Sequence, residues 1–144
     1  MAFLEIEGKQ YEAKMSFKFS RKADSKYKAT EEVTGVESIY QNLLSYNTDA
    51  LLSFWDCATA HYKEQPSLDK IEEALESRIE EEGIENLFKE AFQGIDNSGF
   101  FKLQLREFWN NLDMIDKMVK DEKEKEQMIM AKEMFINRRK ELNP

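Results

Sequence analysis

The sequence predicts a mainly α-helical protein: a helical domain that begins with a short β-hairpin and ends in a long helix. Two short alternating runs, FLEIE and QYEAKM, lie within the first fifteen residues and predict the hairpin. Beyond Gly35, apolar residues recur with the period of an amphipathic helix along most of the chain. In the last segment, apolar steps of four and three are typical of a helix that packs along another helix.

The predicted strands are joined by Gly8 and Lys9, and a glycine at the first central position suits a tight hairpin turn. Leu4 and Ile6 lie on one face of the first strand. Because a lone two-stranded hairpin is only marginally stable, we expect this face to pack on the helices. Helical periodicity begins after the hairpin, and SKYKATEEVTG, residues 25–35, is polar enough to predict a loop.

Four apolar stripes of helical period follow residue 35. They consist of Val36, Ile39, Tyr40, Leu43 and Leu44; of Leu51, Phe54, Trp55, Ala58 and Tyr62; of Leu68, Ile71, Leu75 and Ile79; and of Ile84, Leu87, Phe88, Ala91, Phe92 and Ile95. The second stripe has apolar residues on its other sides as well, so we expect its helix at the centre of the fold. That helix is expected to continue through Tyr62 and to stop at Pro66-Ser67, while Gly83 and Gly94 end the next two helices.

A last stripe consists of Phe101, Leu105, Phe108, Leu112, Ile115 and Val119. The charged run KDEKEKE, residues 120–126, follows it and has no apolar face to bury. We expect one helix to run through the charged segment and past the edge of the domain, because pairs such as Glu122 with Lys125 support a solvated helix. The predicted units are a helical domain with the hairpin, residues 1–119, and a charged helical extension, residues 120–144. Truncation after Lys120 is expected to leave the fold intact and to weaken partner binding or self-association.

Composition limits the classes of function. The chain has 144 residues, enough for one domain, and a net charge of −8 at pH 7. A nonspecific nucleic-acid binder needs a basic face, so we expect no nucleic-acid partner. No apolar stretch approaches the roughly 20 residues that span a bilayer, and we expect no membrane association. The start, MAFLEIEG, lacks the basic region and long apolar segment of a secretory signal, which favours a reducing cytoplasm.

The stretch IDNSGFFKLQLREFW, residues 95–109, has the composition of a calcium-binding loop, but no register supplies the ligands. With Gly99 at the sixth position, the twelfth position is Leu105, which cannot bind the ion. With Asp96 at the first position, Phe101 stands where the sharp turn needs glycine. We therefore interpret the stretch as a helix end followed by a capped helix start, and we expect no metal.

Residue types suited to catalysis are few. His61 is the only histidine and Cys57 the only cysteine, so a zinc site of four Cys and His ligands cannot form. The two lie one turn apart on the predicted helix, an arrangement that permits a thiolate–imidazole pair. The surrounding run is apolar and offers no third group, so packing is the preferred interpretation. We expect neither enzymatic activity nor a cofactor.

One candidate for partner binding is basic. Lys18, Arg21 and Lys22 belong to KFSRKADSKYK, which gathers five basic residues against one acidic residue in an otherwise acidic chain. Such a cluster is an electrostatic handle for a partner. The alternative interpretation is a solvated loop without a binding role, and the residues alone leave both open.

A second candidate is the apolar group beyond the charged run, Met128, Ile129, Met134 and Phe135. Met-rich surfaces adapt their shape to varied partners, which favours a contact with another protein or with a second copy of this chain. The alternative is that the segment folds back and packs in the ordinary way. Periodicity does not choose between the two.

Three stretches carry a family resemblance: LEIEGKQYEAKMSFKFSRKAD, GVESIYQNLLSYNTDALLSFWDCATAHYKEQPSLDKIEEALE and IENLFKEAF, within residues 3–92. The most specific feature is an Ala-rich helix end followed by Lys63-Glu64, Pro66-Ser67-Leu68 and an acidic helix. In these residues the chain resembles the tail assembly chaperone family of long-tailed, siphovirus-type phages and prophages of Gram-positive bacteria. It departs from the family between Asp24 and Gly35, and its residues beyond about 110 have no counterpart there.

The resemblance implies a non-enzymatic chaperone that binds and solubilises the tape-measure protein and helps recruit tail-tube subunits before the tail polymerises. It also implies action in the cytoplasm of the bacterial host and absence from the mature virion. The tape-measure protein, the tail-tube protein and a second copy of the chain are the expected partners. The alternative is a small acidic phage adaptor or inhibitor that binds a host protein. A gene position between the tube and tape-measure genes would favour the chaperone.

Overall fold

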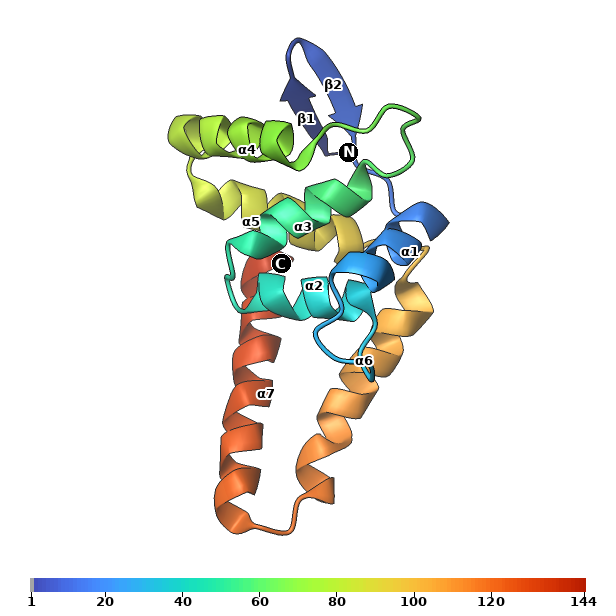
Figure 1. Ribbon diagram of the computed structural model, residues 1–144. Coiled ribbons are helices and arrows are strands. Elements are labelled where there is room, and N and C mark those ends of the chain that lie inside the picture. Colours follow the sequence, from blue (N-terminus) through green and yellow to red (C-terminus); the bar gives the residue numbers. More distant parts are fainter. Residues whose placement is uncertain (1) are drawn as a thin grey trace.

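The computed structural model describes residues 2–144, and these residues form a two-stranded hairpin, seven α-helices and one short 3-10 helix (Figure 1). In chain order the elements are β1 (Phe3–Ile6), β2 (Lys9–Glu12), α1 (Phe17–Lys26), α2 (Gly35–Leu44), α3 (Asp49–Ala58), α4 (Leu68–Glu82), α5 (Ile84–Asp96), α6 (Lys102–Met114), η1 (Ile115–Met118) and α7 (Glu122–Leu142). The predicted fold class is confirmed: a mainly α protein with a hairpin at its amino end and a long helix at its carboxy end.

The hairpin is antiparallel and pairs Ile6 with Lys9 across a two-residue turn. The central residues of that turn are Glu7 and Gly8, both with positive φ, which is the backbone of a type I′ turn. The expectation that Gly8 and Lys9 are the central residues was therefore wrong by one position. Gly8 fits because a type I′ turn favours glycine at its second position. Leu4 and Ile6 are buried as predicted, and β1 packs on α4.

Helices α1 and α2 cross at very short distance. A Cβ atom on Gly35 would lie 2.0 Å from the backbone carbonyl carbon of Ala23, so only glycine fits there. The Gly35 amide also donates to the carboxylate of Asp24 at 2.8 Å. The predicted loop over residues 25–35 is shorter than expected, because α1 continues through Lys26.

The core is built around α3, with α2 and α5 beside it (Figure 1). Trp55 and Phe54 are fully buried, and Tyr40 of α2 stacks on Phe92 of α5 with ring centroids 4.9 Å apart. The central position predicted for this apolar helix is thus confirmed. The sequence put its end too late, however, since α3 stops at Ala58 and not near Pro66.

The early end of α3 has a local cause. The backbone amide of Lys14, just after the hairpin, donates to the carbonyl of Ala58 at 3.0 Å. The hydroxyl of Thr59 donates to the carbonyl of Trp55 at 2.7 Å. The last carbonyls of α3 are satisfied by these groups, and the chain turns away instead of adding another helical turn.

Helices α4 and α5 begin and end largely as predicted. The Ser67 hydroxyl accepts a hydrogen bond from the Lys70 amide and caps α4, and Gly83, with φ +85, separates α4 from α5. Gly94 does not end α5, which continues to Asp96, so that expectation was wrong. Gly94 serves packing instead: a Cβ atom there would lie 3.1 Å from the Phe54 ring.

The carboxy-terminal third forms a helical arm, which we define as α6, η1 and α7, residues 102–142. The sequence predicted one helix through the charged run, and this is wrong. Helix α6 ends at Met114, the chain becomes extended at Val119, and Asp121 caps a new helix by accepting the Lys123 amide at 2.9 Å. A charged run rich in Asp and Glu is as good a helix start as a helix middle, because acidic groups stabilise a helix amino terminus.

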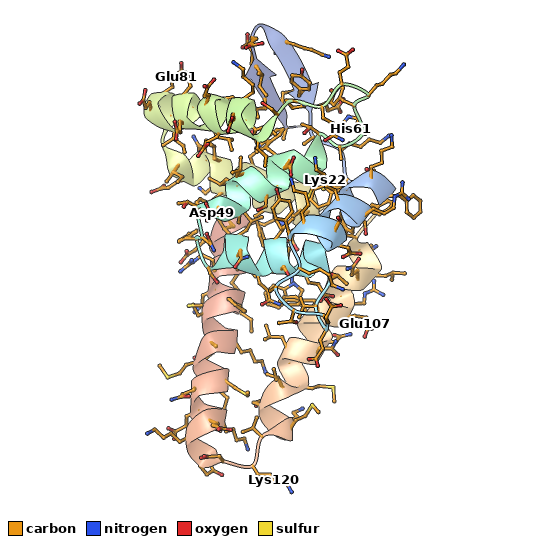
Figure 2. All side chains as sticks on the ribbon, in the orientation of Figure 1. Lys22, Asp49, His61, Glu81, Glu107 and Lys120 are labelled. Carbon is orange, nitrogen blue, oxygen red and sulfur yellow. The ribbon has the colours of Figure 1, made fainter. Side chains whose placement is uncertain are left out.

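Helix α7 then runs back toward the domain, so that the two helices of the arm meet at a tip near Lys120 (Figures 1 and 2). The last turns of α7 reach the core, where Leu142 is buried. Nearer the tip, the ammonium of Lys132 lies 2.7 Å from the carboxylate of Asp113 and joins the two helices. The division of the chain into residues 1–119 and 120–144 stays a prediction, and a truncation described below tests it.

Candidate partner-binding surfaces

The basic segment predicted as a handle lies on α1, and its residues have different surroundings. Lys18 and Arg21 are exposed on the surface of α1. Lys22 is not free: its ammonium lies 2.8 Å from Oδ1 of Asp56 and donates to the Gln65 side chain at 2.6 Å. The structure therefore separates Lys22 from the two residues predicted to act with it.

Asp56 is the reason for this arrangement. Its side chain is only 3% exposed, and besides Lys22 it accepts hydrogen bonds from Lys26 at 2.8 Å and from the Tyr27 hydroxyl at 2.6 Å. Burial pushes the pKa of the Asp56 carboxyl upward, but the hydrogen bonds from these three residues outweigh it and leave the pKa below its ordinary value. Much of the basic cluster thus neutralises a buried acid that the sequence did not single out.

The four apolar residues predicted on the carboxy-terminal segment do not form one exposed face. Met134 is exposed, Met128 and Ile129 are half-buried, and Phe135 packs against the core. The end of α7 packs on the core in the ordinary way, while its middle remains accessible. A partner contact through the accessible part stays a prediction. Three further methionines of the arm are exposed: Met114, Met118 and Met130.

A second buried carboxylate, that of Asp96, fastens the end of α7 to the core. The Asp96 carboxylate, 2% exposed, accepts hydrogen bonds from the Tyr40 hydroxyl at 2.7 Å, the Asn143 amide at 2.7 Å and the Arg139 guanidinium at 3.2 Å. The indole of Trp109 donates to the Tyr40 hydroxyl at 2.8 Å and so joins α6 to the same network. These donors occupy the carboxylate that the calcium interpretation would have used as a ligand.

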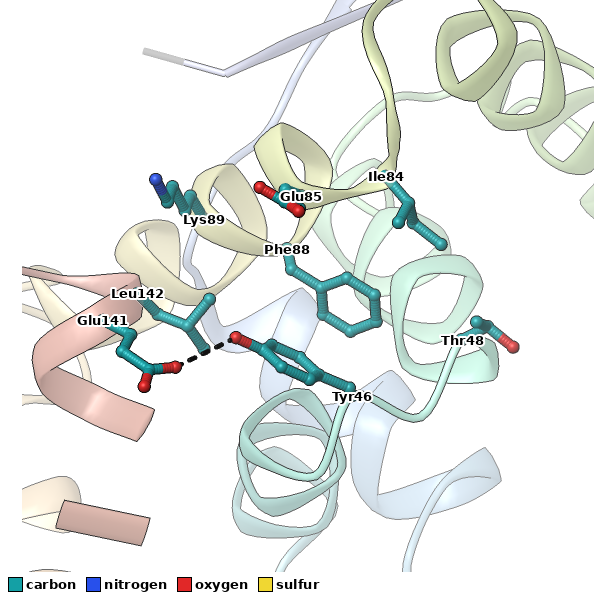
Figure 3. A pocket seen from close by; sticks show the side chains of 8 residues that line it. All are labelled: Tyr46, Thr48, Ile84, Glu85, Phe88, Lys89, Glu141 and Leu142. Carbon is teal, nitrogen blue, oxygen red and sulfur yellow. Dashed lines mark hydrogen bonds between the residues drawn. The ribbon is translucent and has the colours of Figure 1, made fainter. Parts of the chain in front are cut away.

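A groove opens where the end of α7 meets the start of α5 (Figure 3). Its volume is about 640 Å³, within the range of pockets that hold drug-sized ligands. Eight residues line it: Tyr46, Thr48, Ile84, Glu85, Phe88, Lys89, Glu141 and Leu142. The apolar members come from three segments far apart in sequence, which is why no local pattern in the sequence identifies the groove.

An exposed apolar patch on the opposite side of the fold was also missed. Phe17, at the start of α1, meets Phe100 edge to face with ring centroids 4.9 Å apart, and Leu103 follows three residues later at the start of α6. All three side chains are exposed, Phe17 to 69% and Leu103 to 68%. None of these three residues belongs to a stripe singled out in the sequence, because the helical period identifies only the apolar residues that share a face.

Cys57 and His61 do not form a reactive pair. Because α3 ends at Ala58, the two are not on one helix, which corrects the expectation from their spacing. Cys57 is fully buried, and burial raises the pKa of its thiol to about 12, so it stays protonated. For His61, whose charged form is the protonated one, burial lowers the pKa. Its ring lies against Tyr62 with centroids 4.2 Å apart.

Within residues 2–144, no group of three or more His, Cys, Asp or Glu side chains is arranged to hold a metal ion. None of the helices described has both the length and the apolar character needed to cross a membrane.

The fold and these surfaces define a small acidic helical protein suited to contacts with other proteins. The family model described as phage tail assembly chaperone protein, TAC, matches residues 3–110, which are 108 of the 144 residues. The chain belongs to the phage tail assembly chaperone family. Searches of curated proteins and of solved structures gave no match. Membership gives the chain phage tail proteins as partners and a period of action in the host while the tail assembles.

Proposed function

We propose that this chain binds and solubilises the tape-measure protein of its phage and helps recruit tail-tube subunits before the tail polymerises. A tape-measure protein is long, helical and apolar until the tube surrounds it, so it needs reversible cover. The phage or prophage is proposed to be of the siphovirus type and to infect Gram-positive bacteria. The protein acts without enzymatic activity in the host cytoplasm and leaves before the virion is complete.

The observation that carries this proposal is the set of exposed methionines on the helical arm of a tail assembly chaperone. Met118 is 80% and Met130 69% exposed, and Met114 and Met134 of the same arm are exposed as well. Methionine is unbranched and polarizable, so a surface of methionines adapts to many apolar sequences. A long apolar partner without a single recognition motif requires such adaptability.

The other predicted contacts have smaller roles in this proposal. Met128 and Ile129 flank the exposed methionines and add apolar area, whereas Phe135 anchors the arm on the core. Lys18 and Arg21 offer positive charge to an acidic tail-tube surface or to a second copy of the chain, while Lys22 supports Asp56. Self-association through the same exposed methionines is part of the proposal.

The test is co-expression with the tape-measure protein encoded beside this chain, followed by measurement of its soluble fraction. We expect the wild-type chain to raise that fraction. A triple variant, Met118→Ser, Met130→Ser and Met134→Ser, should lose most of the effect because it removes apolar contact and little else. A matched variant of the same arm, Lys123→Ser and Glu126→Ser, should keep it. If neither the wild type nor any variant changes the soluble fraction, the proposed function is wrong.

A further inference from the structure

The groove at the end of α7 has an apolar interior. Phe88 of α5 and Leu142 of α7 are buried and form the floor of the groove (Figure 3). Ile84 and Tyr46 are more exposed and line its opening. The rings of Tyr46 and Phe88 meet edge to face with centroids 5.3 Å apart. An apolar hollow bounded by helices is the kind of surface that accepts one face of another helix.

Tyr46 lines this groove and has a strained backbone conformation. Its φ is +56, in the left-handed region, directly after the last residues of α2, where glycine or asparagine is the usual choice. The residue is 43% exposed, so burial compensates for the strained backbone only in part. Residues held in strained backbone conformations are concentrated at functional sites.

Other groups fix the Tyr46 ring in place. The Arg138 guanidinium lies 3.7 Å from the ring centroid, and the Tyr46 hydroxyl donates to Glu141 at 3.4 Å. Arg138 also donates to the carbonyl of Leu44 at 2.8 Å. The end of α7 thus holds an exposed aromatic ring rigid, and a rigid ring binds a partner with little loss of conformational entropy.

The surroundings of the groove are acidic. Glu85 lies on its rim, and neither it nor Asp49, the residue that follows Thr48 of the groove wall, forms an ion pair with a described residue. Lys89 is the one basic residue in the lining, and Glu141 is partly neutralised by Arg138 at 3.5 Å. A partner with lysine or arginine beside its apolar residues would complement the negative electrostatic potential around the groove.

We propose that the groove binds an amphipathic helix that inserts an apolar side chain against Tyr46 and Phe88 and places basic residues near Glu85. This inference rests on the proposed function, because a helical segment of the tape-measure protein is the occupant to which it commits. None of the exposed methionines of the arm lines the groove, and Leu142 completes it only while α7 is docked on the core.

The experiment uses the full-length protein and overlapping synthetic peptides that tile the adjacent tape-measure protein, with fluorescence anisotropy as the readout. We expect binding by a peptide that combines an apolar helical face with basic residues, and weaker binding at high salt. Tyr46→Gly should weaken it by about tenfold or more, the loss typical of an aromatic anchor. The melting temperature of this variant should change little, because glycine relieves the strained backbone of residue 46 and so offsets the lost ring contacts with Phe88 and Arg138.

Charge reversal gives an independent variant that does not touch the backbone. Glu85→Lys should weaken binding of the same peptide, whereas Glu72→Lys, on an exposed position of α4 outside the groove, should not. Phe17→Ser removes an exposed aromatic ring elsewhere and is the matched control for Tyr46→Gly. A wild-type chain that solubilises the tape-measure protein while both groove variants bind as before would overturn the inference and leave the function standing.

Two further outcomes also overturn it. Light scattering that shows a dimer in the wild type and a monomer in Tyr46→Gly, with peptide binding unchanged, would make a second copy of this chain the occupant. A wild-type chain that binds no peptide and fails to solubilise the tape-measure protein would remove the proposed function and this inference together.

Discussion

Asp56 and Asp96 are two buried carboxylates of the same chemistry that join different parts of the chain. Each accepts a hydrogen bond from a tyrosine hydroxyl, at 2.6 Å and 2.7 Å respectively, and each pairs with cationic side chains. The partners of Asp56 come from α1, about thirty residues earlier in the chain. Asp96 draws its partners from α2 and from the end of α7, more than forty residues away on either side.

The difference concerns what each carboxylate holds in place. Asp56 and its partners all lie within residues 3–110, the region that matches the family model. Asp96 lies in that region too, but Arg139 and Asn143 lie beyond it. Asp56 therefore stabilises the common part of the fold, whereas Asp96 fastens to it a helix that the family match does not include.

The largest expected effect comes from removing that helix. Truncation after Lys120 deletes the buried Leu142 and leaves Asp96 with Tyr40 as its one remaining hydrogen-bond donor among those described. A buried leucine contributes about 2–5 kcal/mol and a broken buried charge network about 3–5 kcal/mol. We expect the free energy of unfolding to fall by about 5 kcal/mol or more, which replaces the expectation from the sequence that the truncated fold stays intact.

Urea denaturation followed by circular dichroism measures this loss. Removal of Pro144 alone is the control, because that residue is exposed and has no hydrogen bond to the core. A truncated chain that unfolds at nearly the wild-type urea concentration would show that residues 120–144 are an independent extension.

The next effect is a contrast between alanine substitutions at the two carboxylates. Asp96→Ala should cost about 3–5 kcal/mol, because the buried Tyr40 hydroxyl then loses its acceptor and cannot reach water. Asp56→Ala should cost less, since Lys22 and Lys26 are partly exposed and can turn toward solvent. Asp96→Asn keeps a carbonyl acceptor and should fall between wild type and Asp96→Ala. Equal midpoints in urea for the two alanine variants would contradict the contrast.

The sequence predicted local features of this fold well and long-range ones poorly. Stripes such as Leu51, Phe54 and Trp55 identified the central helix because helical period is a local property. The role of Asp96 could not be predicted, since its partner Arg139 is 43 residues away and nothing local distinguishes it from a solvated arginine. The groove depends on the same reversal of the chain at residues 115–121, where the charge pattern is compatible with both a continuous helix and a new helix start.

A smaller effect separates a structural lysine from a free one. Lys22→Ala removes one of three donors to Asp56, and we expect a loss of about 1–2 kcal/mol. Lys18→Ala, on the same helix and exposed, should change stability by less than about 0.5 kcal/mol. Thermal denaturation of the two variants gives the comparison. Equal melting temperatures would mean that the ion pair of Lys22 contributes nothing measurable and that the basic segment is a uniform handle after all.

The smallest predicted effect is a pH dependence of stability that belongs to Asp56. Hydrogen bonds from Lys22, Lys26 and Tyr27 leave the pKa of the folded carboxyl below 3.8, the ordinary value for aspartate. A lowered pKa in the folded state means that the contribution is fully present above about pH 4 and is lost as the pH falls through the folded pKa. Glu7 and Asp113 also have lowered pKa values, set by Lys70 and Lys132, and they titrate in wild type and variant alike. The wild type should therefore lose more stability than Asp56→Asn between about pH 4 and pH 2, and urea midpoints across that window measure the difference. Parallel pH profiles would show that the basic residues of α1 do not stabilise the charged form of Asp56.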